Sequence, residues 1–223
     1  MPPTPPCDLD RLRAIIGRGL VAGLGTPKQT CIEGAVALAC GLPLSDTPPC
    51  VAAPDRAYAI AVNDAPWSSP ESRAEALLPL ALAHVGTAGT DRRPWIARLV
   101  DGTIRRVLPL ALRAAANAPG MPPEHATALH AAAGRCATDG TQAAAFAARA
   151  AAFAARAAAW AAGDAAGDAA WDAGDAAWDA VDAARAAARA TWDAWDAGDA
   201  ARAAILRESV AVALDAYRAE GRA

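Results

Sequence analysis

The sequence predicts an all-α protein in two parts: a compact multi-helix domain over residues 1–140, and a long alanine-rich helix or helical hairpin over 141–223. Apolar residues recur at helical spacing between proline-rich connections, and no convincing run alternates apolar and polar residues as a half-buried strand would. From residue 141 to 204, 35 of the 64 residues are alanine, the strongest helix former. These three observations favour helices throughout the chain.

Two helices are predicted in the first forty residues or so. In "DLDRLRAIIGRGLVAGLG", Asp8 can cap the amino end and one of the glycines of "GLG" can end the helix. The second helix is predicted in "TCIEGAVALACG". There Thr30 and Glu33 have the spacing of a capping box, which places Cys31 in the first helical turn.

Further short helices follow up to residue 140. The helix in "APDRAYAIAVND" carries Pro54 in its first turn, where proline is tolerated. In "SSPESRAEALLPLALAHVG", Ser68 and Glu71 have capping-box spacing, and Pro79 should kink or divide the helix. Helical spacing continues through "RPWIARLVDGTIRRVLPLALRAAA" and "PPEHATALHAAAGRC", before "TDG" breaks the pattern.

The tail is predicted to begin at Thr141, a plausible N-cap, and nothing obliges its helix to end before about residue 219. Glycines between 163 and 174 mark where the helix would bend most easily, so a hairpin is the alternative to one straight helix. Larger apolar residues return near the end of the chain and could dock onto the N-terminal domain: Ile205, Leu206, Val210, Val212, Ala213 and Leu214.

One face of the tail carries a seam of aromatic residues and glycines. Its first steps are seven residues long, and later steps alternate four and three, the pattern of a heptad repeat with one stutter. The seam predicts packing against a second helix, from the same chain or from another copy. The alternative is a single solvated alanine helix. The seam residues are Phe146, Phe153, Trp160, Gly167, Trp171, Gly174, Trp178, Val181, Trp192 and Trp195.

Two parts of the sequence carry a family resemblance. They are the run "CIEGAVALACGLPLSDTPPCVAAPDRAYAIAVNDAPW", residues 31–67, and the tail with its "AAWDA" segments. Over nearly its whole length the chain resembles an uncharacterised family of high-GC bacteria and their phages. The resemblance implies the two-part organisation. It implies no activity, cofactor, partner or catalytic residue.

Cys31 is the candidate nucleophile, because a helix N-terminus lowers the pKa of a thiol and raises its thiolate fraction. His84 follows it in the chain and Asp64 is available to orient the imidazole, an order compatible with papain-like chemistry. A cysteine within "CIEGAVALAC" is also typical of a buried core residue, which is the competing interpretation. No family-specific signature surrounds Cys31.

Metal and cofactor sites are not predicted. Cys31, Cys40 and Cys50 are nine and ten residues apart, and no CxxC or HxxxH pair occurs in the chain. The basic pairs at 92–93 and 105–106 could bind a phosphate, but such pairs are more often solvated or paired with acidic residues of the tail.

Charge and hydropathy limit the partners. The net charge of −3 gives no field that would attract nucleic acid. Alanine is a poor membrane anchor and arginines interrupt the apolar tail, so no membrane span is predicted. The start of the sequence lacks the pattern of a secretory signal, and a cytoplasmic location with reduced, mostly packed thiols is expected.

The preferred function is therefore a non-catalytic helical scaffold or protein-interaction module. It would self-associate as a homo-oligomer or bind another protein through the seam. The alternative is a cysteine-dependent hydrolase or transferase centred on Cys31, with the tail as its oligomerisation arm.

Overall fold

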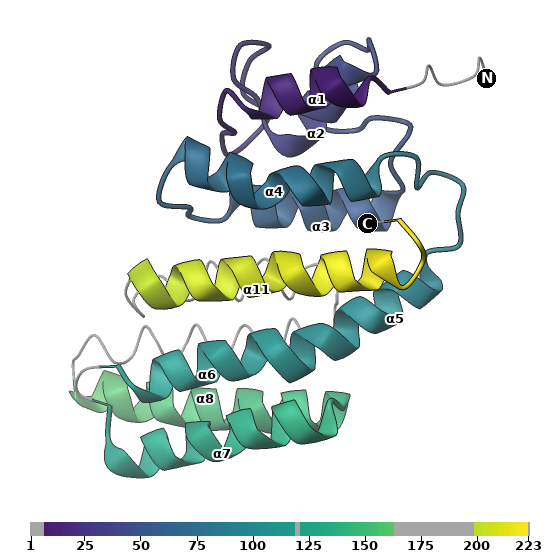
Figure 1. Cartoon of the computed structure of the whole chain (residues 1–223). Coiled ribbons are helices and arrows are strands. Elements are labelled where there is room, and N and C mark those ends of the chain that lie inside the picture. The colour runs from purple at the N-terminus through teal and green to yellow at the C-terminus, as the bar shows by residue number, and fades with distance from the viewer. Residues whose placement is uncertain (1–6, 119–120, 163–198, 223) are drawn as a thin grey trace. The chain divides into compact units, whose positions relative to one another are not determined.

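The computed structural model describes residues 7–118, 121–162 and 199–222, with side chains except those of 156–162 and 199. In these ranges the fold is all-α and contains no strand, which confirms the predicted fold class (Figure 1). The elements in chain order are α1 (Leu9–Ile16), α2 (Ile32–Ala39), α3 (Ala53–Asp64), α4 (Pro70–His84), α5 (Arg93–Gly102), the π-helical segment η1 (Thr103–Val107), α6 (Leu108–Ala116), α7 (Pro123–Asp139), α8 (Gln142–Ala162) and α11 (Asp199–Arg218).

The chain forms two compact units. Residues up to 96 and from 213 onward make the first, and residues 97–212 make the second. The predicted boundary near residue 140 falls inside the second unit, between α7 and α8. No helix in the described part of the chain is both long and apolar enough to cross a membrane.

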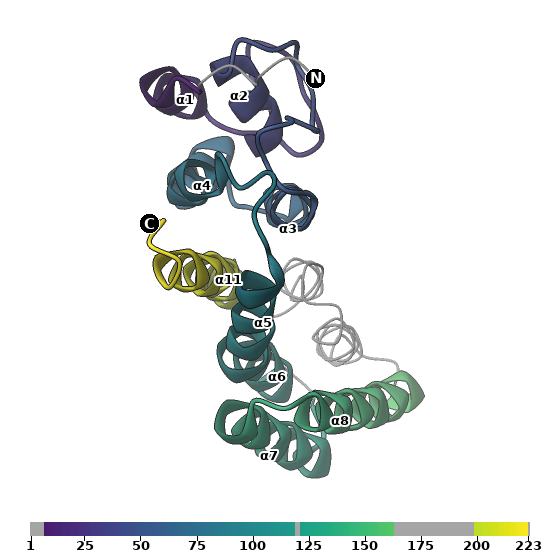
Figure 2. The ribbon, with the colours of Figure 1, turned by 90° about the vertical axis from the view of Figure 1, so that its right-hand side faces the viewer.

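The first unit packs α1 to α4 against one another, and α3 and α4 run side by side (Figures 1 and 2). Its core is built from large side chains that are almost fully buried, among them Leu12, Ile16, Ile32, Tyr58, Leu77, Leu80 and Trp95. Asp8 caps α1 as predicted, because its carboxylate accepts hydrogen bonds from the Asp10 and Arg11 amides at 3.0 and 2.9 Å. The helix ends earlier than predicted, at Ile16, with Gly17 as its C-cap.

The start of α2 differs from the predicted capping box. The N-cap is Cys31, because the Thr30 hydroxyl is already engaged in donating to the Leu24 carbonyl at 2.7 Å. Gly34 makes this arrangement possible: a Cβ there would lie 2.0 Å from the Thr30 hydroxyl oxygen. Glu33 does not reach back to the helix end and lies fully buried instead.

The start of α4 is also shifted by one residue. Ser69 and Ser72 form the capping box, with reciprocal backbone-to-hydroxyl hydrogen bonds of 3.0 and 3.1 Å, in place of Ser68 and Glu71. Pro79 lies within one continuous helix and does not divide it. Proline removes a hydrogen bond to the carbonyl four residues earlier, which here belongs to the exposed residue Glu75.

In the second unit, α6, α7 and α8 pack together (Figures 1 and 2). Gly140 ends α7 in the left-handed conformation, with φ of +63°. The Arg105 guanidinium donates to the carbonyl oxygens of Thr138 and Asp139 at 2.6 and 2.9 Å, and so satisfies the carboxyl end of that helix. The predicted break at "TDG" is confirmed.

The tail begins and ends near the predicted residues. The Thr141 hydroxyl accepts a hydrogen bond from the Ala144 amide at 3.2 Å at the start of α8, and α11 ends at Arg218. The choice between one straight helix and a hairpin concerns residues 163–198, which lie outside the described residues. The predicted docking residues near the end of the chain, from Ile205 to Leu214, are buried.

Candidate functional site

Cys31 lies at the helix N-terminus but is not an activated thiol. Its Sγ accepts a hydrogen bond from the Gly34 amide at 3.3 Å, and the residue is only 3% exposed. Burial raises the pKa of the thiol, and this effect outweighs the amide hydrogen bond, which lowers it. The expected lowering by the helix N-terminus is present in the Gly34 amide hydrogen bond, but burial at the same position outweighs it, so the net pKa of the Cys31 thiol is raised.

Asp64 is used to hold the loop that precedes α2. Its Oδ1 accepts hydrogen bonds from the Gly23 amide and from the Asn63 side chain, both at 2.8 Å. Asn63 in turn accepts from the Ile32 amide at 3.2 Å and donates to the Val21 carbonyl at 2.8 Å. These contacts fix the backbone on both sides of Cys31, and the Asp64 charge adds to the raised pKa of that thiol.

His84, at the end of α4, faces Glu33 on α2. Its Nε2 lies 3.8 Å from the Glu33 Oε1, and both side chains are 0% exposed. Neither the imidazole nitrogens nor the carboxylate oxygens have a hydrogen-bond partner among the described residues. Burial raises the pKa of Glu33 well above its usual value and lowers the pKa of His84 to about 3. At neutral pH the imidazole is therefore uncharged.

The three predicted catalytic residues are thus placed around the start of α2 but in separate contacts. Cys31 interacts with Gly34, Asp64 with the loop, and His84 with Glu33. All three are shielded from solvent to differing degrees, with Cys31 and His84 fully buried. A hydrolase or transferase needs a nucleophile that a substrate can reach, and this arrangement does not provide one.

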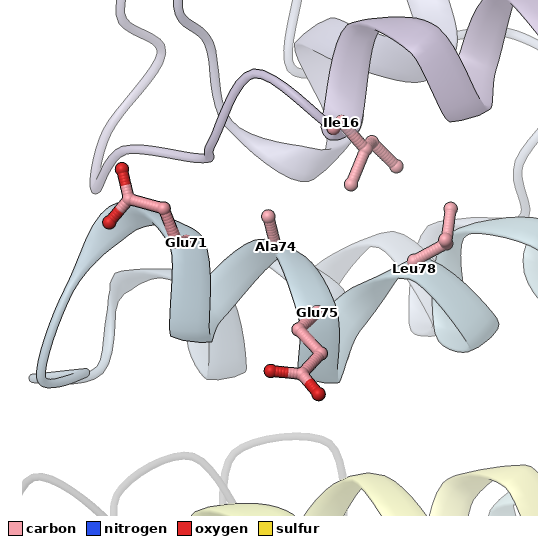
Figure 3. Close-up of a pocket in the computed structure, with 6 residues that line it drawn as sticks. Ile16, Glu71, Ala74, Glu75 and Leu78 are labelled. Carbon is pink, nitrogen blue, oxygen red and sulfur yellow. The ribbon is translucent and has the colours of Figure 1, made fainter.

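A pocket of about 200 Å³ lies elsewhere in the first unit, between the end of α1 and α4 (Figure 3). Its lining is aliphatic at Ile16, Ala74 and Leu78, with the exposed carboxylates of Glu71 and Glu75 beside them. None of the predicted catalytic residues lines it. The pocket offers no nucleophile.

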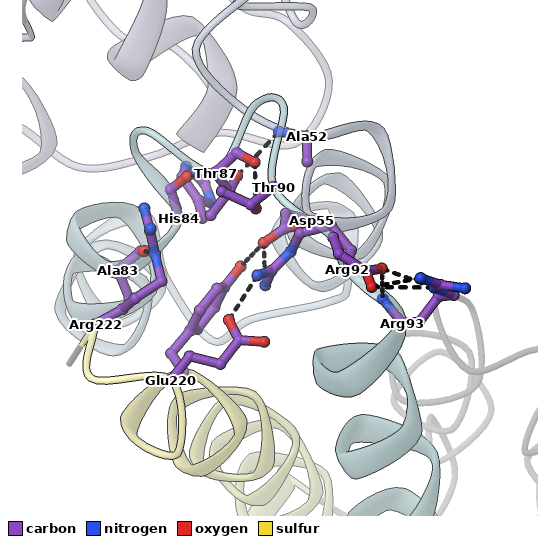
Figure 4. Close-up of polar contacts among 12 residues, drawn as sticks. Ala52, Asp55, Ala83, His84, Thr87, Thr90, Arg92, Arg93, Glu220 and Arg222 are labelled. Carbon is purple, nitrogen blue, oxygen red and sulfur yellow. Dashed lines mark hydrogen bonds and ion pairs between the residues drawn. The ribbon is translucent and has the colours of Figure 1, made fainter.

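The sequence did not reveal a buried polar cluster that joins the end of the chain to α3 (Figure 4). The Arg92 guanidinium donates twice to the Asp55 carboxylate, at 2.8 Å each, and once to Glu220 at 2.6 Å. The Tyr217 hydroxyl donates to Asp55, which is only 1% exposed. The Arg92 guanidinium also lies 5.0 Å from the Trp95 ring centre. A solvated or phosphate-binding Arg92 is therefore a wrong expectation.

The last residues also cap a helix of the first unit. Arg222 donates to the carbonyl oxygens of Ala83 and Val85, at 3.4 and 2.8 Å, so a cation stands at the carboxyl end of α4 (Figure 4). The Thr87 hydroxyl donates to the His84 carbonyl at 2.8 Å and accepts from the Ala52 amide at 2.9 Å. These contacts, like those of Arg92, serve the fold.

The other basic residues of the two pairs are also paired. Arg93 bonds Asp91 at 2.8 Å on the surface, and Arg105 bonds Asp101 at 2.9 Å in addition to its carbonyl contacts. Arg106 bonds Glu208 of α11. Arg92 and Arg106 both pair with residues of the tail, as expected, but their partners are glutamates, Glu220 and Glu208, and not aspartates. In the described ranges, no group of three or more His, Cys, Asp and Glu side chains is arranged to hold a metal ion.

The predicted seam is described only at its start. On α8, Phe146 is 45% exposed and Phe153 is half-buried, with the Arg149 guanidinium 5.0 Å from its ring centre. The buried face of α8 consists of alanines instead: Ala144, Ala145, Ala148, Ala152 and Ala155. Trp160 has no described side chain, and the following seam residues lie outside the described ranges: Gly167, Trp171, Gly174, Trp178, Val181, Trp192 and Trp195.

Comparisons with protein-family models, with curated proteins and with solved structures found no match to this chain. The resemblance to an uncharacterised family of bacteria and phages stays a prediction.

Proposed function

We propose that the protein is a non-catalytic helical scaffold or protein-interaction module, which self-associates or binds a protein partner through the predicted seam of the tail. One observation carries the proposal. Helix α8 buries its alanine face within the second unit, while Phe146, on the seam, keeps 45% of its surface exposed.

The division between the two faces has a physical basis. Alanine side chains let two helix backbones approach closely, and α8 uses them where it packs against α7. The contact of α8 with α7 is therefore made through small side chains, and the seam residue Phe146 lies on the other side of the helix. Aromatic side chains gathered on an accessible face favour contact with another protein.

The chemistry of the first unit supports a non-catalytic role. Cys31 and His84 are buried, the pKa of Cys31 is raised, and the pocket between α1 and α4 is lined by other residues. The reading of the chain as a cysteine-dependent hydrolase or transferase gains no support from these contacts. A cytoplasmic location goes with the proposal, since the five cysteines are free thiols, the resting state that a reducing compartment favours.

The test is the solution mass of the full chain, measured by light scattering after size exclusion over a range of concentrations. We expect an oligomer that dissociates when Trp171, Trp178, Trp192 and Trp195 are replaced by alanine. The matched control is Leu24→Ala, which removes a 39% exposed apolar side chain that is not on the seam. It should leave the mass unchanged.

A monomeric mass for the full chain at every concentration would overturn self-association. The partner-binding form of the proposal would then be tested by cross-linking in cell extract, with the four-tryptophan variant as the negative control. Equal cross-linking of the wild-type chain and this variant would overturn that form as well.

A further inference from the structure

Three cysteines of the first unit lie near one another. The Sγ atoms of Cys40 and Cys50 are 3.5 Å apart, and both residues are buried, at 2% and 9% exposure. Cys7 is partly exposed. The backbone amide of the next residue, Asp8, donates to the carbonyl of Ala39, the residue before Cys40, at 3.2 Å, which places Cys7 beside Cys40. Cys40 therefore lies between the partly exposed Cys7 and the buried Cys50.

Backbone hydrogen bonds fix the main chain of Cys40 and of Cys50. Cys40 is the C-cap residue of α2, and its amide donates to the Val36 carbonyl at 3.0 Å. The Cys50 carbonyl accepts from the amides of Gly86 and Ala88 at 3.0 and 3.2 Å. A disulfide needs an Sγ–Sγ distance of about 2.05 Å, so the two sulfur atoms must approach each other by about 1.5 Å from their 3.5 Å separation.

We propose that Cys7, Cys40 and Cys50 form a thiol relay, in which oxidation enters at Cys7 and ends as a Cys40–Cys50 disulfide. The oxidant is a low-molecular-weight disulfide such as oxidised glutathione. The product ties the end of α2 to the segment that precedes α3. The relay is independent of the seam and of the scaffold function.

The relay proceeds by three thiol–disulfide exchanges. First, the Cys7 thiolate attacks a sulfur of the oxidant, whose S–S bond breaks, and one glutathione leaves as thiolate and takes up the proton that Cys7 lost. Second, Cys40 attacks the Cys7 sulfur and expels the other glutathione as a thiol. Third, Cys50 attacks the Cys40 sulfur and restores the Cys7 thiol. Overall, two protein thiols are oxidised to one disulfide, and one oxidised glutathione is reduced to two thiols.

The surroundings of the thiols explain why the entry point matters. Burial raises the pKa of Cys40 to about 11 and of Cys50 to about 12, with Cys7 adding to the first shift and Cys40 and Glu33 adding to the second. The thiolate fraction of the inner pair is therefore small at neutral pH, and direct attack on a bulky disulfide is blocked by burial. Burial also raises the pKa of the Cys7 thiol, so its partial exposure, and not a larger thiolate fraction, makes it the entry point.

The sequence allows a sharp assay with the full native chain. After treatment with oxidised glutathione, remaining thiols are alkylated under denaturing conditions and the chain is digested with trypsin. One tryptic peptide, residues 29–56, holds Cys31, Cys40 and Cys50, while Cys7 lies on residues 1–11. A second cleavage before Asp46 separates Cys40 from Cys50 unless a disulfide joins them.

We expect the two halves of the peptide 29–56 to stay linked in the oxidised wild-type chain and in Cys31→Ser. Cys50→Ser should stop at a disulfide that links residues 1–11 to 29–56, and Cys40→Ser should stop with one glutathione on Cys7. Cys7→Ser should slow formation of the inner disulfide on the order of tenfold or more. Cys136→Ser is the matched control, because that buried thiol lies in the second unit, near the Ala144 carbonyl.

Two results would overturn the relay. One is a wild-type chain whose Cys40 and Cys50 remain alkylated after oxidation, a result that does not depend on how any variant folds. The other is an unchanged rate in Cys7→Ser, provided that its circular dichroism spectrum and unfolding midpoint match those of the wild type.

Discussion

The first compact unit buries charged and aromatic side chains together, whereas α8 of the second unit is buried through alanine. In the first, Asp55, Arg92 and Tyr217 form one hydrogen-bonded group at 6% exposure or less. In the second, α8 is buried through Ala144, Ala145, Ala148, Ala152 and Ala155. The charged core of the first unit requires particular side chains to be paired, because an unpaired buried charge is costly. The alanine face of α8 mainly determines how closely two helices pack.

The two cores also differ in which substitutions lower their stability. A buried charge is tolerated only while its partners are in place, so loss of one partner leaves the other uncompensated. A close-packed alanine face tolerates loss of polar groups but not added volume. We therefore expect the two units to be sensitive to opposite kinds of substitution.

The largest effect is expected from Arg92→Ala in the first unit. It leaves the Asp55 carboxylate buried without its guanidinium partner, which should lower the free energy of unfolding by about 3–5 kcal/mol. The neighbouring Arg93→Ala is the matched control, because Arg93 pairs with Asp91 on the surface, and it should change little. Urea unfolding measures both. Equal effects would show that the buried cluster does not stabilise the first unit.

Added volume should break the alanine face of the second unit. Ala148→Leu places three extra carbon atoms at a position with 0% exposure, and we expect a loss of about 3 kcal/mol. Ala147→Leu, one residue earlier on the exposed side of α8, should stay within about 0.5 kcal/mol of the wild type. A reversed order in thermal unfolding would mean that α8 buries the other face.

Two glycines of α7 and its carboxyl end, Gly134 and Gly140, differ in backbone conformation and in the space around them. Gly140→Ala forces a side chain into a left-handed conformation and places its Cβ 2.2 Å from the Arg105 Cζ, so Arg105 must leave the helix end. The expected loss is about 2 kcal/mol. Gly134→Ala, in the middle of the same helix with open space around it, should instead stabilise by about 0.5–1 kcal/mol. Denaturation midpoints that shift in the same direction would contradict this account.

The last test concerns the pH dependence of stability at the pair of Glu33 and His84. The raised pKa of Glu33 gives stability that is fully present below its usual value of 4.5 and is lost as the pH rises through the folded-state pKa. Glu33→Gln removes this loss. The free energy of unfolding of the variant should therefore rise relative to that of the wild type as the pH increases above 4.5. The difference should reach about 1.4 kcal/mol for each unit by which the pKa of Glu33 is raised.

His84 acts in the opposite direction and serves as the internal control. Its pKa is lowered to about 3, so its contribution is present above the usual 6.5 and is lost as the pH falls toward 3. That acid loss should occur in both the wild type and Glu33→Gln. A stability difference between the two chains that stays constant from pH 4.5 upward would contradict a raised Glu33 pKa.

Local signals in the sequence predicted the helices well and their first residues less well. The capping serine of α4 is one residue later than predicted, because two serines were available and Ser69 finds Ser72 three residues on. At α2 the hydroxyl of Thr30 is used by a loop carbonyl, so Cys31 becomes the cap. The competing hydrogen bonds come from backbone that sequence spacing does not place.

The candidate site was predicted less well, because its residue types were recognisable but their partners were not. His84 was available as a base by its position in the chain, yet it faces Glu33, which the capping-box spacing had assigned to a helix end. The only sequence signal for the buried cluster was the return of larger residues near the end of the tail. It indicated docking but not the partners Asp55 and Arg92.

By itself the sequence determined the all-α class, the caps at Asp8 and Thr141 and the break at Gly140, since helical periodicity and capping depend on residues three or four apart. Only the tertiary structure decided which buried charges meet. Tyr217 reaches Asp55 across 162 positions of the chain, and Glu220 reaches Arg92 across 128. Burial raises the cost of any unpaired charge, so these distant partners are selected by the folded core and leave no periodic signal in the chain.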